Sequence, residues 1–441
     1  MISFTIKTIG CKVNIYESNK IKDDLINNGL NYINVEEKEN YDKLDLYIVN
    51  TCSVTSIADK KSRQMLHLAR KYNKDIIVVA IGCLVDSIKI KNNKKNEEIL
   101  SGIDLFISNK EKKDAINIIL NYLSENKKLT LSKNTYNKKN NTDNVVEKTS
   151  ENILQKQQVR SFVKIQDGCN QYCTYCIIPY LRGNIKSKDN DLIIEEVEQH
   201  VKKGAKEIVL TGIHLSSFGL DRVGLTYESN GALDVARKSL IEILSLISKI
   251  NAVERIRLGS IEPRVINEKF LMSIKNDEVL DKKFCKSFCL SLQSGCDKTL
   301  KRMNRHYTTS DFRCACKIIR DIFNVVTITT DVIVGFPGES IDDYLESLNF
   351  VKEMRFYNPN IFPYSRRKGT KADEMTGQLT NIEKHKRVKR MIEECDKISK
   401  EIDIENDKLD NKILIEEIIE DNGRKYGVGY TNDYRKKRIP I

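Results

Sequence analysis

The sequence contains no apolar run that approaches the roughly 20 residues needed to span a membrane as a helix, so we expect no membrane association. Its N-terminus, MISFTIKTIGCKVN, also lacks the long apolar segment and the cleavage site of a secretory signal. From these two absences we expect a cytoplasmic protein. In that reducing compartment the 12 cysteines are better explained as metal ligands or catalytic groups than as disulfides.

Acidic residues are outnumbered, because 62 Asp and Glu stand against 74 Lys and Arg, for a formal net charge of +12. A basic balance favours a polyanionic partner such as RNA. The alternative is a compositional bias, since the sequence is rich in Lys, Asn and Ile throughout. A length of 441 residues allows two or three domains.

Strand-like and helical segments alternate along most of the chain, which predicts a parallel α/β architecture. The expected strands are 3–10, 44–51, 75–82, 161–166, 207–212, 255–260, 287–293, 328–335 and 358–365. The last six, separated by helical segments, predict a six-unit partial βα barrel. The expected organisation is an α/β domain at 1–127, a polar Asn- and Lys-rich linker at 128–160, the barrel at 161–378, a helical connector at 379–408 and a small β module at 409–441.

Three cysteines that are distant in sequence each follow a predicted strand directly, namely Cys11, Cys52 and Cys83. In an open parallel sheet, ligands bind beyond the carboxyl ends of the strands, so these thiols are expected at one place. Thiolates suit iron–sulfur clusters or zinc. The alternative for each residue is a buried structural cysteine, which is a common state of free cysteine. The position shared by all three favours a common metal or cluster.

A second group of three lies within DGCNQYCTYCIIPYLRG (167–183), where Cys169, Cys173 and Cys176 have no fourth cysteine beside them. A closed structural zinc site needs four ligands. A [4Fe–4S] cluster on three cysteines leaves one iron open to a small molecule. This loop follows the first barrel strand and so lies on the face that carries the chemistry in βα barrels. Two other interpretations are a zinc site with a distant fourth ligand and a helix whose cysteines bind nothing.

The C-x3-C-x2-C loop on a partial βα barrel resembles the radical S-adenosylmethionine (SAM) superfamily. The N-terminal cysteines narrow this resemblance to the methylthiotransferases, and within them the chain is similar to the MtaB-type tRNA branch over nearly its whole length. The segments that carry the resemblance, besides the cysteine loop, are TIGCKVNIYES (8–18), NTCSVT (50–55), LTGIHLSSFG (210–219), LSLQSGCDKTLKRMNRHYT (290–308), DVIVGFPGE (331–339) and FPYSRRKGTKA (362–372).

The resemblance implies an enzyme that adds a methylthio group to carbon 2 of N6-threonylcarbamoyladenosine at tRNA position 37. It implies two [4Fe–4S] clusters. The cluster on Cys169, Cys173 and Cys176 would bind SAM and yield a radical on one-electron reduction. The cluster on the N-terminal three cysteines would handle the sulfur. The implied partners are tRNA, a reduced electron donor such as flavodoxin or ferredoxin, and a sulfide source.

The resemblance also implies SAM contacts at the carboxyl ends of the barrel strands, at Thr211, Gly212, Ser260, Glu262, Gln293, Ser294, Val334 and Gly335. Basic loop residues are expected to contact tRNA phosphates, namely Arg182, Lys186, Arg366, Arg367 and Lys368. The alternative for each is an ordinary loop residue or a solvated basic side chain. The resemblance assigns the last segment to a short TRAM-like RNA-binding module.

Three features depart from the family pattern. Lys186 stands where Arg is usual, Cys289 stands where His is frequent, and the TRAM-like segment is short. Two rival functions are an enzyme of the same family that acts on an aspartate of a ribosomal protein, and a zinc-dependent RNA-binding protein without catalysis.

Overall fold

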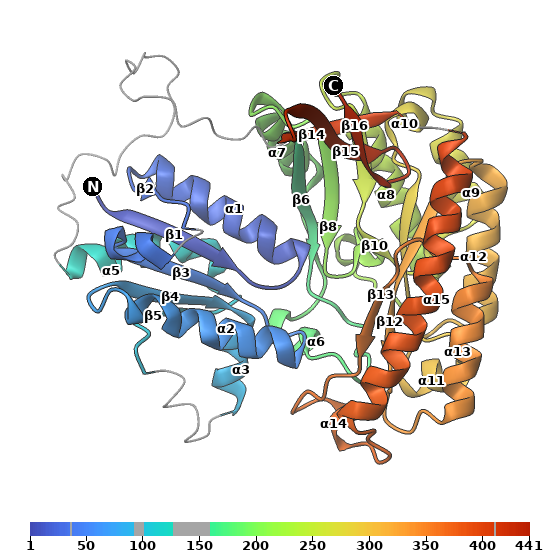
Figure 1. The fold of residues 1–441 in the computed structure, drawn as a ribbon, viewed down its shortest axis with the longest axis horizontal. Coiled ribbons are helices and arrows are strands. Elements are labelled where there is room, and N and C mark those ends of the chain that lie inside the picture. Colours follow the sequence, from blue (N-terminus) through green and yellow to red (C-terminus); the bar gives the residue numbers. More distant parts are fainter. Residues whose placement is uncertain (36–37, 92–100, 127–158, 410–411) are drawn as a thin grey trace. The chain divides into compact units, whose positions relative to one another are not determined.

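The computed structural model describes residues 1–35, 38–91, 101–126, 159–409 and 412–441. The chain divides into two compact units, Met1–Gln157 and Gln158–Ile441, called here the N-terminal and C-terminal units (Figure 1). The predicted linker at 128–160 lies outside the described residues except for its last two positions. The boundaries expected for the individual segments stay predictions. Within the described ranges, no helix is long and apolar enough to cross a membrane.

The N-terminal unit is built on a five-stranded parallel sheet with the order β2-β1-β3-β4-β5. Its strands are β1 (Ser3–Thr8), β2 (Asn31–Tyr32), β3 (Leu46–Thr51), β4 (Ile77–Gly82) and β5 (Leu105–Ile107). Its described helices of more than one or two turns are α1 (Lys12–Asn27), α2 (Ser56–Leu68), α3 (Cys83–Lys91) and α5 (Ala115–Glu125). The three strands expected from the sequence correspond to β1, β3 and β4, and the parallel sheet is confirmed.

The central strands β3 and β4 are buried at every position. Parallel strands covered on both faces have this continuous apolar pattern. Alternate side chains enter two separate cores, because Ile48 and Val79 pack with α1 and α5 residues while Tyr47 and Val78 pack with α2 residues. The sheet is therefore a rigid layer, and the turns after the carboxyl ends of its strands are held in fixed positions.

The C-terminal unit contains the predicted barrel of six βα units, and its six parallel strands run in two sheets, β7-β6-β8-β9 and β10-β11-β12-β13. The third barrel strand is split into β9 and β10, and β7 is a short antiparallel addition to β6. The strands are β6 (Arg160–Asp167), β7 (Lys186–Ser187), β8 (Glu207–Gly212), β9 (Arg255–Leu258), β10 (Ser260–Ile261), β11 (Ser287–Gln293), β12 (Thr327–Val334) and β13 (Asn360–Pro363).

Helices lie between the barrel strands and after the last of them, and they cover the outer face of the strands (Figure 1). They are α6 (Ile178–Arg182), α7 (Asn190–Lys202), α8 (Ala232–Ser248), α9 (Glu268–Lys275), α10 (Glu278–Lys283), α11 (Asp297–Arg302), α12 (Thr309–Ile322), α13 (Ile341–Glu353), α14 (Lys371–Glu374) and α15 (Asn381–Asp407). Helices α12 and α13 begin with capping boxes at Thr308 and Ser340, whose side chains accept from the third residue of the helix. The helix starts after β11 and β12 are thus fixed locally by the sequence.

A three-stranded antiparallel sheet ends the chain, in the order β14-β15-β16. Its strands are β14 (Ile413–Asp421), β15 (Arg424–Thr431) and β16 (Lys436–Pro440), which confirms the small β module expected from the sequence. It contacts the amino ends of the barrel strands. Arg160, the first residue of β6, lies over the Tyr430 and Tyr434 rings at 4.6 and 4.9 Å, and Arg257 lies 3.6 Å from the Tyr434 ring.

The Glu207 carboxylate forms ion pairs with both of these arginines. Its carboxylate accepts from Arg160 Nε at 3.0 Å and from Arg257 Nε at 2.9 Å, and the side chain is fully buried. The charges are paired and the arginines also stack on aromatic rings, so the terminal sheet is fixed to the barrel by specific contacts rather than by a simple apolar surface.

Candidate functional site

The first cysteine trio lies along three neighbouring strands of the N-terminal sheet. Cys11 follows β1, Cys52 follows β3, and Cys83 is the first residue of α3 after β4. Strand β3 lies between β1 and β4 and pairs with both, and Thr51 is opposite Gly82. The three cysteines therefore lie at the carboxyl ends of adjacent strands. Their role as ligands stays a prediction.

Gly10 allows the turn after β1 to approach Cys52 closely. Its φ is +111°, and a Cβ at this position would lie 2.6 Å from Cys52 Cβ and 2.7 Å from Cys52 Sγ. Any side chain at position 10 would push the turn away from Cys52. Cys52 and Cys83 are buried whereas Cys11 is exposed, so the trio opens to solvent at Cys11.

Asn14, in the segment CKVN, holds the first two cysteine turns together. Its Nδ2 donates to the carbonyl oxygens of Ile9 at 2.7 Å and Thr51 at 3.0 Å. The Asn50 amide in turn donates to the carbonyl of Asn14 at 3.0 Å. Both side chains are buried, and satisfied buried amides of this kind fix backbone positions. The polar residues of this motif thus position the cysteines.

Two N–H groups point at sulfur atoms of this trio. The backbone N–H of Val54 donates to Cys52 Sγ at 3.4 Å, and Asn109 Nδ2 donates to Cys83 Sγ at 3.6 Å. Asn109 is held by Asp86, which accepts from its Nδ2 at 2.7 Å. Donors near a thiolate stabilise its negative charge and orient a metal ligand.

The second trio comes from one compact loop after β6. Gly168 has φ +68°, and a Cβ there would lie 1.8 Å from the carbonyl oxygen of Asn184, so only glycine fits at this position. The backbone N–H of Cys169 donates to the carbonyl of Gly183 at 3.0 Å. The loop is therefore folded tightly against the chain after α6, and its three thiols stay together.

Burial controls the protonation of this loop. It raises the pKa of Cys169 to about 11 and raises the pKa of Cys176 as well. Both thiols are neutral near pH 7 in the metal-free chain, and metal binding must displace their protons. No three His, Cys, Asp or Glu side chains in the described ranges are spaced to hold one metal ion. Three thiols on one loop are the donor type that iron–sulfur clusters take, so the chemistry of the donors suits a cluster.

Buried polar atoms near this loop lack protein partners. Asn170 Oδ1, Gln171 Nε2 and His214 Nε2 have none among the described residues. The other ring nitrogen of His214, Nδ1, lies 2.6 Å from Ser217 Oγ, and burial lowers the pKa of this histidine to about 4. His214 is therefore neutral at pH 7. Orphaned buried polar atoms indicate an additional bound group, which fits a cluster with a cofactor on it.

The eight predicted SAM contacts lie at the carboxyl ends of four consecutive barrel strands, the same end of the barrel as the cysteine loop. They are Thr211 and Gly212 on β8, Ser260 on β10 and Glu262 after it, Gln293 on β11 and Ser294 after it, and Val334 on β12 and Gly335 after it. Gln293 has φ +67°, a conformation that a residue other than glycine rarely adopts and that is frequent at functional sites.

The predicted SAM contacts differ in their exposure and in the protein partners they already have. Ser260 is exposed and its Oγ lies 2.9 Å from Cys289 Sγ, the cysteine that replaces the family's frequent histidine. Glu262 is buried and bound by Arg264, whose Nε and Nη2 donate to its two oxygens at 2.7 and 2.9 Å. Burial alone would raise the pKa of Glu262, but Arg264 outweighs it and lowers that pKa. Glu262 is thus a carboxylate that already has a cationic partner.

Arg305 was missed by the sequence analysis, although it lies in the quoted segment LSLQSGCDKTLKRMNRHYT. Its Nη1 donates to Cys173 Sγ at 3.2 Å, and its Nε donates to Tyr307 OH at 3.0 Å. The signal in the sequence was a cation three residues after the end of α11, at the carboxyl face of the barrel. Nothing local in the sequence identifies its partner, because 132 positions separate Arg305 from Cys173.

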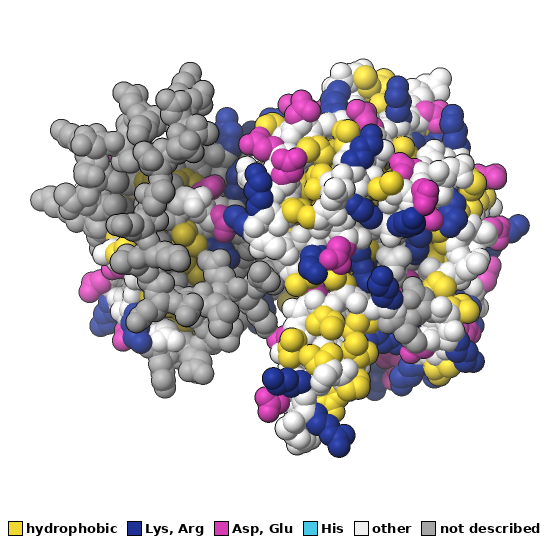
Figure 2. All heavy atoms as spheres, turned by 90° about the horizontal axis from the view of Figure 1, so that it is seen from above, with side chains coloured by type: hydrophobic (Ala, Val, Ile, Leu, Met, Phe, Trp, Pro, Cys, Tyr) yellow, Lys and Arg dark blue, Asp and Glu magenta, His cyan; other side chains and the backbone are white. Residues whose placement is uncertain are grey.

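The five basic residues expected at tRNA fall into two groups. Lys186, Arg366 and Lys368 are exposed, whereas the side chain of Arg182 is only 3% exposed and Arg367 is buried. Arg182 pairs with Asp167 at 3.1 Å. On the face seen in Figure 2, Lys and Arg side chains are spread among acidic and apolar ones and do not form one continuous patch.

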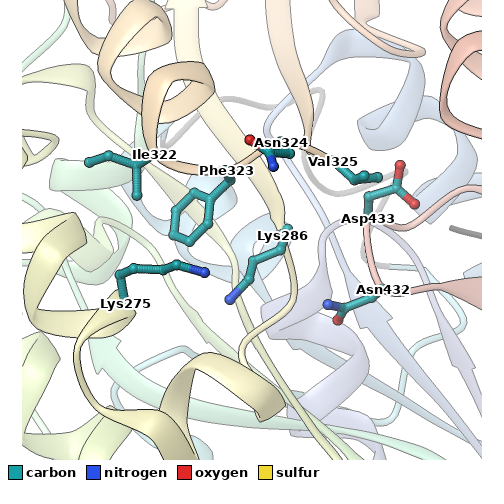
Figure 3. Close-up of a pocket in the computed structure, with 8 residues that line it drawn as sticks. All are labelled: Lys275, Lys286, Ile322, Phe323, Asn324, Val325, Asn432 and Asp433. Carbon is teal, nitrogen blue, oxygen red and sulfur yellow. The ribbon is translucent and has the colours of Figure 1, made fainter. Parts of the chain in front are cut away.

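The cavity in Figure 3 does not belong to this site. It has a volume of about 300 Å³ and lies at the turn between α12 and β12, at the amino end of that strand. Lys275 and Lys286 line it, but both donate to Asp281. Asp433, which also lines it, pairs with Arg435 at 2.7 Å. The charges are already compensated, and no reacting group is present among the lining residues.

Comparisons with known proteins agree over the whole chain. The family model described as "Radical SAM superfamily" matches residues 163–351, and the one described as "Uncharacterized protein family UPF0004" matches residues 3–103. Threonylcarbamoyladenosine tRNA methylthiotransferase MtaB of Bacillus subtilis (strain 168) is 33% identical, with 99% of this chain and 90% of the relative covered. The protein of the same name from Aquifex aeolicus (strain VF5) is 33% identical, with 94% and 92% covered.

A tRNA-2-methylthio-N(6)-dimethylallyladenosine synthase of Clostridium perfringens (strain SM101 / Type A) is 31% identical, with 93% of this chain and 85% of the relative covered. Among solved structures, the radical S-adenosylmethionine methyltransferase TsrM from Kitasatospora setae, with cobalamin and a [4Fe-4S] cluster bound, has a TM-score of 0.56. That pair is 14% identical over 85% of this chain and 77% of TsrM, a likeness that shows the fold alone.

The barrel, its cysteine loop and the superfamily match define a radical SAM enzyme. The chain belongs to the methylthiotransferase family within that superfamily. It is therefore a transferase that uses an iron–sulfur cluster and SAM.

Proposed function

We propose that this chain adds a methylthio group to carbon 2 of N6-threonylcarbamoyladenosine at position 37 of tRNA. One observation carries the proposal: two cysteine trios lie at the carboxyl ends of two parallel sheets, in a chain 33% identical to an MtaB protein over 99% of its length. A carbon–hydrogen bond of an adenine ring resists acid–base chemistry, so the reaction needs both a radical source and a sulfur source. One cysteine trio would serve the radical source, and the other would serve the sulfur source.

Cys169, Cys173 and Cys176 hold one [4Fe–4S] cluster in this proposal, and Cys11, Cys52 and Cys83 hold the other. Three protein ligands leave one iron open at each cluster. SAM bound at the cluster on Cys169, Cys173 and Cys176, called here the central cluster, would supply radical chemistry on one-electron reduction, directed at the adenine carbon. Solvent access at Cys11 supports the assignment of sulfur exchange to the N-terminal trio.

Side chains around the loop of Cys169, Cys173 and Cys176 bind and orient the cofactor in this proposal. Arg305 is a half-buried guanidinium that no carboxylate pairs among the described residues, and it suits a carboxylate of the cofactor. His214, held neutral by burial, offers Nε2 as a polar contact without adding charge. Thr211 and Gln293 lie at the ends of β8 and β11, where a bound cofactor would extend across the barrel.

Exposure supports Lys186, Arg366 and Lys368 as phosphate contacts for tRNA, although Arg366 also pairs with Asp373 at 2.8 Å. Arg182 and Arg367 fit a structural role better, since a long basic side chain that is buried does not reach a phosphate in solution. A reduced flavodoxin or ferredoxin as electron donor and a separate sulfide source complete the proposal.

Mass spectrometry of tRNA nucleosides tests the substrate. A strain without the gene should lack the methylthio form of N6-threonylcarbamoyladenosine and accumulate the parent nucleoside. The intact gene should restore it, and the Cys173→Ala gene should not. Restoration of the methylthio dimethylallyl nucleoside instead would move the substrate to that of the C. perfringens relatives. Unchanged tRNA together with a lost aspartate modification on a ribosomal protein would refute the tRNA assignment.

Metal analysis after anaerobic purification tests the two clusters. The chain should contain about eight irons and eight sulfides. Replacing Cys11, Cys52 and Cys83 together by alanine should leave about four of each. Stoichiometric zinc in a colourless protein would refute both clusters.

A further inference from the structure

Arg305 is a half-buried cation that is hydrogen-bonded to Cys173, one of the proposed cluster ligands. It lies between α11 and α12, and its Nη1 donates to Cys173 Sγ at 3.2 Å. A guanidinium that donates to a thiolate makes a charge-assisted hydrogen bond, which is about twice as strong as a neutral one. This contact differs from the N-terminal trio, where the donors to sulfur are a neutral amide and a backbone N–H.

Tyr307 fixes the orientation of this guanidinium. Its hydroxyl accepts from Arg305 Nε at 3.0 Å and donates to the carbonyl of Leu292 at 2.8 Å, at the end of β11. The Tyr307 ring lies 4.8 Å from the guanidinium carbon and is almost fully buried. Arg305 is therefore held toward Cys173 by a rigid strand, and its position is not a chance surface conformation.

No carboxylate in the described part of the chain is paired with Arg305. Glu262 is the acidic residue whose charge acts on it most, but both oxygens of Glu262 are bound by Arg264. A half-buried charge without a carboxylate partner loses part of its hydration, so its placement beside a cysteine sulfur calls for a function of the charge itself.

We propose that Arg305 sets the reduction potential of the central cluster by stabilising its reduced form. This inference rests on the proposed cluster at Cys169, Cys173 and Cys176. Reduction transfers one electron from the donor protein to the cluster, and no bond is formed or broken. The added negative charge is spread over the iron–sulfur core and its thiolates, and a cation hydrogen-bonded to one thiolate favours that state. Arg305 thus makes the cluster easier to reduce.

A redox titration followed by the electron paramagnetic resonance of the reduced cluster tests this. The protein is the full chain with Cys11, Cys52 and Cys83 replaced by alanine, so that one cluster gives the signal. SAM is left out, because its carboxylate would also bind the guanidinium. Arg305→Gln should lower the reduction equilibrium constant about tenfold, which is 59 mV for one electron. Arg305→Lys, which keeps the charge, should recover part of this difference.

Arg313→Gln is the matched control. Arg313 lies on α12 and pairs with Glu353 in an exposed ion pair, so its loss should leave the potential unchanged. An Arg305→Gln protein with four irons and the control potential overturns the inference and leaves the cluster intact. If Arg305→Gln binds no iron, Tyr307→Phe is titrated in its place. That variant keeps the guanidinium but removes the hydroxyl that orients it. A lowered potential supports the inference, and an unchanged one overturns it. A parent protein without about four irons refutes the proposed cluster itself.

Discussion

Replacing Gly10 by alanine should remove the N-terminal cluster and leave the central one in place. The backbone at Gly10 has φ +111°, a region that costs an ordinary residue about 1–2 kcal/mol. The new Cβ would also lie 2.6 Å from Cys52 Cβ, 0.8 Å inside the closest ordinary van der Waals contact. Such overpacking costs about 1–3 kcal/mol, or moves Cys52 by a comparable distance. A displaced Cys52 no longer shares a cluster with the other two cysteines.

Gly29→Ala is the control for the backbone cost. Gly29 follows α1 in the same unit with φ +85°, and a Cβ there would meet no atom within 4 Å. Both variants therefore carry the strain of a left-handed backbone, but only Gly10→Ala carries the collision. Iron per chain should stay at about eight in Gly29→Ala and fall to about four in Gly10→Ala. SAM cleavage should persist in both, and methylthiolation should be lost only in Gly10→Ala. Eight irons and full methylthiolation in Gly10→Ala would refute the reasoning.

Three further predictions concern other parts of the chain. Cys173→Ala should abolish SAM cleavage, whereas Cys52→Ala should keep cleavage and lose sulfur insertion; full methylthiolation by Cys52→Ala would contradict this division. Burial lowers the pKa of His214 to about 4 in the folded chain, so the unfolded chain binds the proton first as pH falls. The free energy of unfolding should therefore decrease between about pH 6.5 and 4, by up to about 3 kcal/mol. Urea unfolding of His214→Gln should lack that part of the decrease, and an identical pH profile would be evidence against it. Glu207→Gln leaves the buried Arg257 without its carboxylate, whereas Arg160 keeps Glu416 at 2.7 Å. The change should cost about 3–5 kcal/mol in urea unfolding, and a loss below about 1 kcal/mol would show that Arg257 finds another partner.

Much of the fold was predictable because buried parallel strands are continuous apolar runs. Strand β4 was expected at 75–82 and lies at 77–82, and the expected 207–212 and 287–293 have the bounds of β8 and β11. Three edge strands, β2, β5 and β7, were missed because two or three residues carry no periodic pattern. The placement of Cys11, Cys52 and Cys83 at adjacent strand ends was predictable because each follows a predicted strand directly, and their role as ligands stays a prediction.

Contacts between distant segments were not predictable. Arg305 meets Cys173 only because the loop after β6 and the turn after α11 share one face of the barrel. Arg182 and Arg367 have the same side chain as the exposed Arg366, and the sequence alone does not show that they are buried in the fold. Glu262 was predicted as a contact for SAM, and the sequence did not show that Arg264, two residues later, donates to both of its oxygens.

Strand β6 runs from the terminal sheet to the cysteine loop and so sets the distance between them in the C-terminal unit. Its first residue, Arg160, contacts Tyr430 and Tyr434 of the terminal sheet, and its last residue, Asp167, precedes the cysteine loop. Eight residues of extended chain measure about 26 Å. If the terminal sheet holds RNA, as its TRAM-like resemblance implies, an RNA modified at the cysteine loop would have to bridge that length. The base that reaches the loop would then be selected by its distance along the RNA, in addition to its chemistry.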